Sequence, residues 1–269
     1  MLRSNWKLAL SVGPNAMNAE TLTRLSDAGI HEIELSSGQI APFYEVLAYP
    51  SRAKEYSTLA ASCGVTISSI HLPFGPFSQI DPSTQDPEKR AFLLEKQSEL
   101  IRAAGDAGIG IAVIHPSGEP YPAEERAQRL ARACGVMEQL TRVATESGMV
   151  LALENLPRTC LGRTSEEMLY FLDRIPELRA CFDTNHSLSE DNIHFIRALG
   201  SKIVTLHVSD YDGVDEKHWL PGEGINDWSA ILTALEEVGY AGRFLYELGG
   251  KPEYSAVRAN YEKILSFEG

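Results

Sequence analysis

The sequence predicts an α/β protein, a single (β/α)₈ (TIM) barrel that occupies residues 1–269. The chain has 269 residues, close to the roughly 250 that such a barrel needs. Short apolar runs alternate with longer amphipathic runs along its whole length, as expected for parallel strands joined by crossover helices. No Gly-rich dinucleotide-binding motif follows any apolar run, which weakens the alternative of an open, doubly wound sheet.

The apolar runs give the predicted strands in order. They cover residues 6–13, 31–37, 65–73, 110–116, 149–155, 178–184, 202–209 and 243–249. Between them, segments such as 87–107 and 123–147 repeat apolar residues at intervals of three and four, which predicts helices. Thr164 and Glu167 form a capping box that opens a further helix. Glycine at positions 29, 64, 108, 148 and 239 marks the helix ends that precede strands.

The composition restricts the partners and the compartment. The formal net charge is −13, which opposes nucleic-acid binding because that binding depends on Lys and Arg displacing counterions. We therefore expect no nucleic-acid partner. Four cysteines without a CxxC spacing are typical of free thiols in a reducing cytoplasm, where we place the protein. No window approaches the ~20 apolar residues of a membrane span, so we expect no membrane contact.

Polar side chains stand where the predicted strands end. In a barrel of this type the chemistry lies at the carboxyl ends of the strands. Strands three to eight end, in order, at His71, His115, Glu154, Asp183, His207 and Glu247, and the loops after strands six and seven add His186 and His218. Several unpaired carboxylates at one rim would be costly to bury. A divalent cation would remove that cost, so we predict a metal site here.

Four of these residues lie on neighbouring strands and can converge on one ion. Glu154, Asp183, His207 and Glu247 would offer three oxygens and one nitrogen. This oxygen-rich set suits Mn²⁺, Co²⁺, Mg²⁺, Fe²⁺ or Zn²⁺. His71 and His115 lie further round the rim. There they would bind a second ion, contact substrate or orient a carboxylate.

The motifs around these residues resemble the xylose isomerase-like barrel superfamily, which includes sugar (phosphate) isomerases and epimerases and the apurinic-site endonucleases. The motifs are LALENLP, FDTNH, LHVSD, HWLPGEG and LYELGG. In the epimerase branch, the resemblance implies that Glu154 and Glu247 both ligate the metal and exchange protons with the substrate. It also implies that Asp183 and His207 complete the metal site and that His186 binds a substrate oxygen.

The endonuclease branch is the alternative. Its members use three zinc ions, and eight residues of this chain match that larger ligand set: His71, His115, Glu154, Asp183, His186, His207, His218 and Glu247. This chain differs from the endonuclease pattern at Glu216, where the endonucleases have Asp. A second or third zinc ion, and a phosphodiester hydrolase acting on abasic DNA, therefore stay open.

Charge and loop composition favour the sugar-modifying branch. The loop after strand one has no Lys or Arg, and residues 38–51 after strand two are apolar and aromatic, which suits a small ligand better than a phosphate backbone. We predict a divalent-metal-dependent isomerase or epimerase of a small sugar, sugar phosphate or related polyol or keto compound. A dehydratase-type reaction and a non-catalytic barrel are further alternatives.

Further candidates for substrate binding are Arg158, His218 and Trp219. Arg158, four residues after Glu154, would meet a phosphate or carboxylate, and Trp219 would pack against a sugar face. Superfamily members often pair, so the resemblance leaves a homo-oligomer open.

Overall fold

The protein was analysed as a computed structural model that describes residues 3–36, 50–250 and 252–267. Residues 37–49 lie outside the described part, and they include most of the apolar and aromatic segment 38–51 that was expected to border a ligand. Eight strands form one parallel sheet: β1 (Lys7–Val12), β2 (Glu32–Ser36), β3 (Thr66–His71), β4 (Ile111–Ile114), β5 (Val150–Glu154), β6 (Arg179–Asp183), β7 (Ile203–His207) and β8 (Arg243–Tyr246). Each strand falls within its predicted range.

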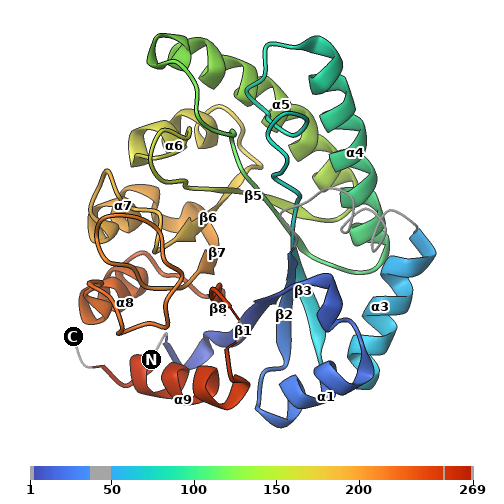
Figure 1. The fold of residues 1–269 in the computed structure, drawn as a ribbon, viewed down its shortest axis with the longest axis vertical. Helices are drawn as coiled ribbons and strands as arrows, with labels where there is room; N and C mark the ends of the chain where they lie inside the picture. The colour runs from blue at the N-terminus through green and yellow to red at the C-terminus, as the bar shows by residue number, and fades with distance from the viewer. Residues whose placement is uncertain (1–2, 37–49, 251, 268–269) are drawn as a thin grey trace.

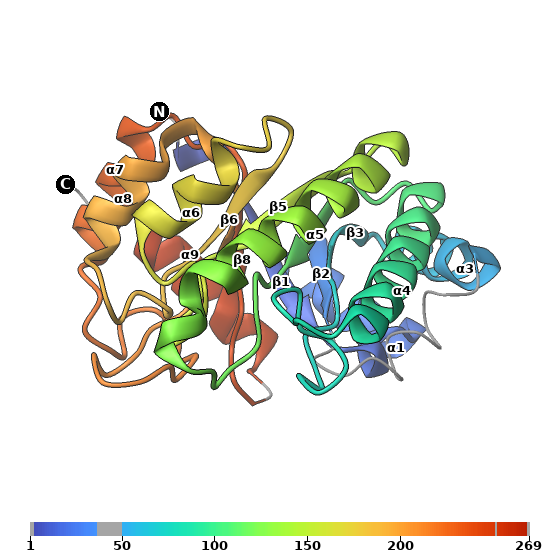
Figure 2. The ribbon, with the colours of Figure 1, turned by 90° about the horizontal axis from the view of Figure 1, so that it is seen from above.

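The strands close into a barrel. Their order is β7-β6-β5-β4-β3-β2-β1-β8. Backbone hydrogen bonds from Val208 N to Leu245 O (2.8 Å) and from Glu247 N to Val208 O (3.2 Å) join the two ends. Figure 1 shows the strands around a common axis with the helices outside them, and Figure 2 shows the same barrel from the side. The predicted (β/α)₈ barrel is therefore confirmed.

Helices cover the outside of the barrel. The α-helices of the described residues are α1 (Ala19–Asp27), α3 (Pro50–Ser62), α4 (Pro87–Asp106), α5 (Arg126–Glu146), α6 (Ser165–Leu172), α7 (Asn192–Leu199), α8 (Trp228–Glu237) and α9 (Tyr254–Leu265). As predicted, Thr164 caps α6 by accepting a hydrogen bond from Glu167 N. Gly148 follows α5 at φ +71°, a left-handed conformation that glycine adopts without strain. No helix in these ranges has the length and apolar character needed to cross a membrane.

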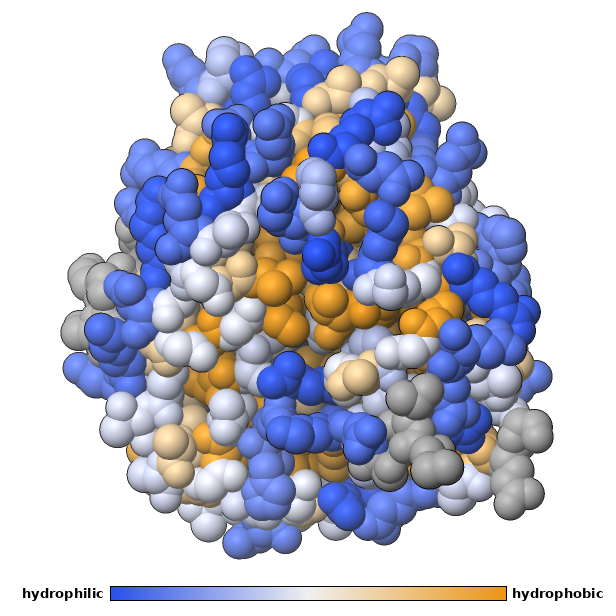
Figure 3. Space-filling view, turned by 180° about the vertical axis from the view of Figure 1, so that it is seen from behind, coloured by the Kyte–Doolittle hydropathy of each residue, from blue (hydrophilic) through white to orange (hydrophobic). Residues whose placement is uncertain are grey.

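Strand residues alternate between two environments. Outward-facing residues such as Leu35, Leu153 and Phe182 pack with the helices in the main hydrophobic core. The barrel interior holds a small apolar cluster that contains Val113 and Cys181. Figure 3 shows the face opposite to Figure 1, with hydrophobic residues gathered near its centre and hydrophilic residues around them. At the carboxyl ends of the strands the interior becomes polar instead, and this polar end positions the site.

Candidate active site

Four predicted metal ligands meet at the carboxyl end of the barrel. Glu154, Asp183 and His207 are the last residues of β5, β6 and β7, and Glu247 directly follows β8. Each offers one ligand atom, and the four atoms all lie within 4.8 Å of one another. The first three side chains are buried, whereas Glu247 is 21% exposed. Adjacent parallel strands thus bring together residues that are up to 93 positions apart in the sequence.

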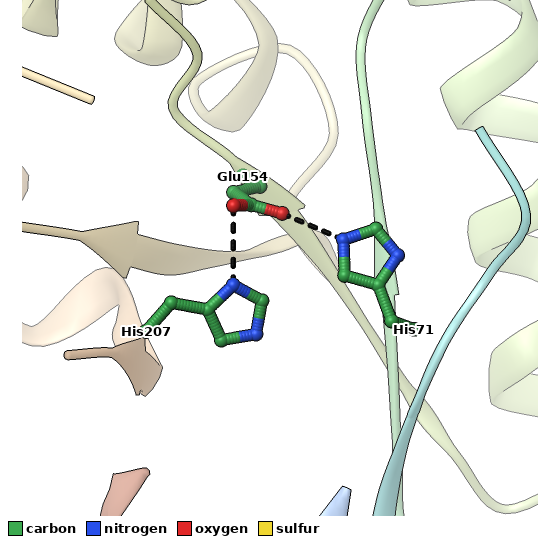
Figure 4. A group of neighbouring side chains, drawn as sticks. All are labelled: His71, Glu154 and His207. Carbon is green, nitrogen blue, oxygen red and sulfur yellow. Dashed lines mark hydrogen bonds and ion pairs between the residues drawn. The ribbon is translucent and has the colours of Figure 1, made fainter. Parts of the chain in front are cut away.

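Glu154 is at the centre of the group. Its Oε1 lies 3.1 Å from His207 Nδ1, and its Oε2 lies 2.9 Å from His71 Nε2 and 3.2 Å from His115 Nε2. Figure 4 shows Glu154 between the His71 and His207 rings. Burial alone would raise the pKa of Glu154, but the charges and hydrogen bonds of His207 and His115 outweigh it and lower that pKa well below its ordinary value. Glu154 is therefore ionised at neutral pH.

Asp183 is held so that one of its carboxylate oxygens has no hydrogen-bond donor. Asn155 clamps its backbone, accepting from Asp183 N (2.7 Å) and donating to Asp183 O (3.0 Å). Asp183 Oδ1 accepts a hydrogen bond from Asn185 N at 2.5 Å, while Oδ2 is buried without a hydrogen-bond donor. His186 Nδ1 and His207 Nδ1 lie 3.6 Å and 3.9 Å from this oxygen. Burial raises the pKa of Asp183 to about 6; the carboxylates of Glu247 and Glu154 add to the rise, and His186 opposes it.

These residues fit a divalent cation. A buried carboxylate oxygen without a donor is costly, and Asp183 Oδ2 belongs to the group of four converging ligands. Two further carboxylates crowd the same space. A doubly charged ion would satisfy the unpaired oxygen and offset the repulsion between the carboxylates. The donor set of three carboxylates and one imidazole suits the oxygen-preferring divalent metals and zinc.

A second group of ligands lies beside the first. His186, Glu216 and His218 offer atoms that also lie within 4.8 Å of one another, with His186 Nε2 3.1 Å from Glu216 Oε2. His218 has φ +53°, and Asn185 Oδ1 accepts from its backbone N–H at 3.4 Å. The hydrogen bond from His186 is the main cause that lowers the pKa of Glu216 to about 2. Burial opposes protonation of His186, but Asp183, Glu216 and Glu154 outweigh it and raise the pKa of His186 to about 10. The pair of His186 and Glu216 is therefore ionic at neutral pH.

A cavity of about 160 Å³ is lined by residues of both groups. Its described walls also include Phe74 and Phe77, and Phe74 stacks on His115 with ring centroids 4.4 Å apart. A larger cavity of about 680 Å³ shares Glu247 with it. The site therefore combines charged ligands, histidines and an aromatic wall, which are the components of a pocket for a small polar molecule.

The sequence model of the xylose isomerase-like TIM barrel family matches residues 22–265. The chain belongs to this family. Among solved structures, it is similar to a D-tagatose 3-epimerase-like protein, with 21% identity, a TM-score of 0.80 and coverage of 95% of this chain and 97% of the other. It is also similar to the 3-keto-D-glucoside 4-epimerase YcjR of E. coli, with 15% identity, a TM-score of 0.73 and coverage of 96% and 99%. At these identities, the structural likeness shows the fold.

Sequence relatives match only part of the chain. The uncharacterized protein MJ1311 of Methanocaldococcus jannaschii is 27% identical over 176 residues, which are 62% of this chain and 60% of that protein. The uncharacterized protein ML2432 of Mycobacterium leprae is 23% identical over 186 residues, or 60% and 64%. This xylose isomerase-like barrel thus spans less than two thirds of the length of either relative.

Two residues that were predicted to contact substrate, Arg158 and Trp219, have neighbours that the sequence did not indicate. Arg158, which lines the smaller cavity of this xylose isomerase-like barrel, pairs with Glu119 (2.7 Å), Asp215 (2.7 Å) and Glu216 (2.8 Å). It is thus already neutralised by carboxylates. Trp219 is exposed and forms a backbone bridge with Asp210. It is not among the described lining residues of either cavity at the site, where Phe74 and Phe77 supply the aromatic surface instead.

The sequence analysis missed three residues of this family member's site. Asn155 and Asn185 brace Asp183 and His218 through backbone hydrogen bonds. Glu34 is buried inside the barrel on β2 and contacts His207. The available signal was the strand HEIELSS, in which acidic residues occupy alternate positions of an otherwise apolar run. That alternation places both acids on one face of the strand, here the barrel interior.

Proposed function

We propose that the protein is a divalent-metal-dependent isomerase or epimerase that acts on a small sugar or a related polyol or keto compound. The observation that carries the proposal is the convergence of Glu154, Asp183, His207 and Glu247, with Asp183 Oδ2 left without a hydrogen-bond donor. Solved structures of the same fold named D-tagatose 3-epimerase-like protein, D-psicose 3-epimerase and L-ribulose 3-epimerase support the sugar as substrate class.

The four converging residues would hold the metal. When bound, the ion supplies a positive charge that stabilises the negative charge developing on the substrate oxygens as a proton leaves the adjacent carbon. Asn155 and Asn185 keep Asp183 in place through its backbone and its Oδ1. The chain thus fixes the ligand positions before a substrate enters, which is what electrostatic preorganisation requires.

Two glutamates would move the proton. Glu154 ends β5 and Glu247 directly follows β8, and these strands are the two ends of the arc that provides the ligands. Burial opposes ionisation of Glu247, but His207 and His218 favour it, and the pKa of Glu247 is lowered overall. Both carboxylates can therefore accept a proton at neutral pH. Carboxylates on two sides of a substrate can take a proton from one face and return one to the other.

The charge around the cavity favours an uncharged sugar over a sugar phosphate. Arg158 is the single Arg or Lys among the described lining residues of the smaller cavity, and three carboxylates neutralise it. A substrate phosphate would have to compete with Glu119, Asp215 and Glu216 for this side chain. Phe74 and Phe77 would instead offer an apolar surface to the C–H face of a sugar ring.

Proton exchange tests the proposal directly. Protein loaded with Mn²⁺ or Mg²⁺ would be incubated in D₂O with a panel of ketoses and ketose phosphates, and NMR would follow deuterium at the carbons next to the carbonyl. We expect incorporation from a free ketose, and none with Glu247→Gln. Failure of the whole panel to exchange with metal-loaded protein would contradict the proposal.

The second group of ligands favours one other function. His186, Glu216 and His218, together with His71 and His115, would provide positions for further zinc ions, as a phosphodiester hydrolase with three zinc ions requires. The net charge of −13 disfavours a duplex substrate. Three zinc ions per chain and cleavage of an abasic duplex would establish this alternative.

A further inference from the structure

Glu34 is a buried acid inside the barrel for which the proposed reaction has no role. It lies on β2 and is fully buried, a state that a carboxylate adopts at a cost unless it is paired. Glu34 Oε2 accepts a hydrogen bond from Ser69 Oγ at 2.9 Å, and Glu34 Oε1 lies 3.0 Å from His207 Nε2. Its partners therefore include one of the four converging ligands.

His207 is contacted on both ring nitrogens, by groups on opposite sides. On the Nδ1 side lie Glu154 Oε1 at 3.1 Å and Glu247 Oε2 at 3.3 Å, both from the ligand group. On the Nε2 side lies Glu34, which is in none of the ligand groups found among the described residues. The His71 ring stacks on His207 at 5.6 Å, with 23° between the ring planes. His207 is thus fixed in both plane and direction.

We propose that Glu34 is a positioning residue for the metal centre. An imidazole nitrogen that binds a metal must present its lone pair, so the ring proton has to be on the other nitrogen. Glu34 accepts the hydrogen bond from Nε2–H of His207 and so directs the lone pair of Nδ1 toward Glu154 and Glu247. A carboxylate behind a metal-binding histidine has this effect in general, and it also increases the basicity of the ring.

Ser69 completes the arrangement. Its hydroxyl on β3 occupies the second oxygen of Glu34, which leaves Oε1 for His207. The series of side-chain contacts from Ser69 through Glu34 to His207 runs from β3 to β2 and then across the barrel interior to β7. The inference rests on the metal-binding part of the proposed function, and it adds a residue that neither touches the substrate nor binds the ion.

The test compares metal affinity in two matched variants. Glu34→Gln keeps a hydrogen-bond acceptor but removes the charge. Glu32→Gln makes the same change two residues earlier, on the same face of β2, where Glu32 pairs with Lys7 (3.0 Å) and Arg243 instead. Calorimetric titration with Mn²⁺, without any sugar, would give the Kd. We expect Glu34→Gln to bind about 10- to 100-fold more weakly and Glu32→Gln to bind like the wild type.

A second measurement reads the proton position in the wild-type protein and needs no variant. In zinc-loaded protein with ¹⁵N-labelled histidine, long-range ¹H–¹⁵N spectra should show His207 protonated on Nε2 and metal-bound at Nδ1. An unchanged Kd in Glu34→Gln while the wild type binds Mn²⁺ would overturn the role of Glu34 alone. A proton on Nδ1 would overturn both the role of Glu34 and the assignment of His207 as a metal ligand. If the wild type binds no divalent metal, the proposed function fails together with this inference.

Discussion

Replacing Asp183 by Asn should make the metal-free protein more stable and the metal-loaded protein less stable than the wild type. Asp183 is fully buried, and its Oδ2 has no hydrogen-bond donor. The carboxylates of Glu154 and Glu247 lie in the same ligand group. Without a cation, the wild type therefore buries a negative charge that His186, 3.6 Å away, compensates only in part. Asn removes this charge while its side-chain oxygen can still accept from Asn185 N.

The size of the effect follows from the pKa. Burial and the neighbouring carboxylates raise the pKa of Asp183 to about 6, against an ordinary value of 3.8. A rise of about two pH units, at about 1.4 kcal/mol each, corresponds to roughly 3 kcal/mol as an upper limit. We expect about 1–3 kcal/mol in favour of Asp183→Asn at pH 7–8 in metal-free buffer. Because a raised acid pKa destabilises the fold only where the group is ionised, this gain should shrink as the pH falls from 6 toward 4.

Urea unfolding followed by circular dichroism, with and without Mn²⁺, measures both effects. A metal at a hundred times its Kd adds about 2.7 kcal/mol to the wild type, while the variant, having lost a ligand, should gain much less. The order of stability should therefore reverse when the metal is added. The exposed pair of Asp173 and Lys202 (3.1 Å) provides the control, because Asp173→Asn should change stability by less than about 1 kcal/mol.

A metal-free Asp183→Asn protein that is clearly less stable than the wild type would refute this reasoning, since the neighbouring His186 would then compensate the carboxylate fully. Equal stabilisation of wild type and variant by Mn²⁺ would refute the assignment of Asp183 as a ligand.

Three further predictions concern the site and the barrel. Glu247→Gln should reduce turnover by about 10²–10⁴-fold, the range for loss of a general base, with an unchanged circular dichroism spectrum; near-normal kcat would contradict the proton-transfer role. Treatment with EDTA should abolish activity, and titration should restore it with one ion per chain, so a requirement for three ions would favour the hydrolase. Burial would raise the pKa of Glu32, but Arg243 and Lys7 outweigh it and lower that pKa. Glu32→Gln should therefore cost about 1–2 kcal/mol of unfolding free energy at pH 7. This cost should fade as the pH drops below the ordinary carboxyl pKa of 4.5 and through the lowered folded value; a cost that did not depend on pH would contradict the ion pairing.

Much of the fold could be predicted because each barrel unit repeats a local pattern. The strand that ends at Glu154 shows it: Leu151 and Leu153 face the helices, Ala152 and Glu154 face the interior, and Gly148 marks the helix end before it. The rim residues followed from the same logic, since parallel strands all end at one side of the barrel. The neighbouring sequence was enough to predict a residue's location in the site where that location depended only on the residue's position along one strand.

Pairings between distant strands could not be read in this way. Glu34 and His207 are 173 residues apart and meet across the barrel interior, and nothing near either residue marks the partner. The ion-pair partners of Arg158, Glu119 and Asp215, lie in other loops. The sequence around Arg158 therefore did not predict that this cation is paired. Trp219 follows His218 in the sequence, yet its side chain is exposed and lines neither cavity among the described residues.

Anomalous diffraction from crystals grown with Mn²⁺ tests the central claim most directly. We predict one strong anomalous peak within bonding distance of Glu154, Asp183, His207 and Glu247. A peak confined to His186, Glu216 and His218, or crystals with no ordered Mn²⁺ at the carboxyl end of the barrel, would contradict it.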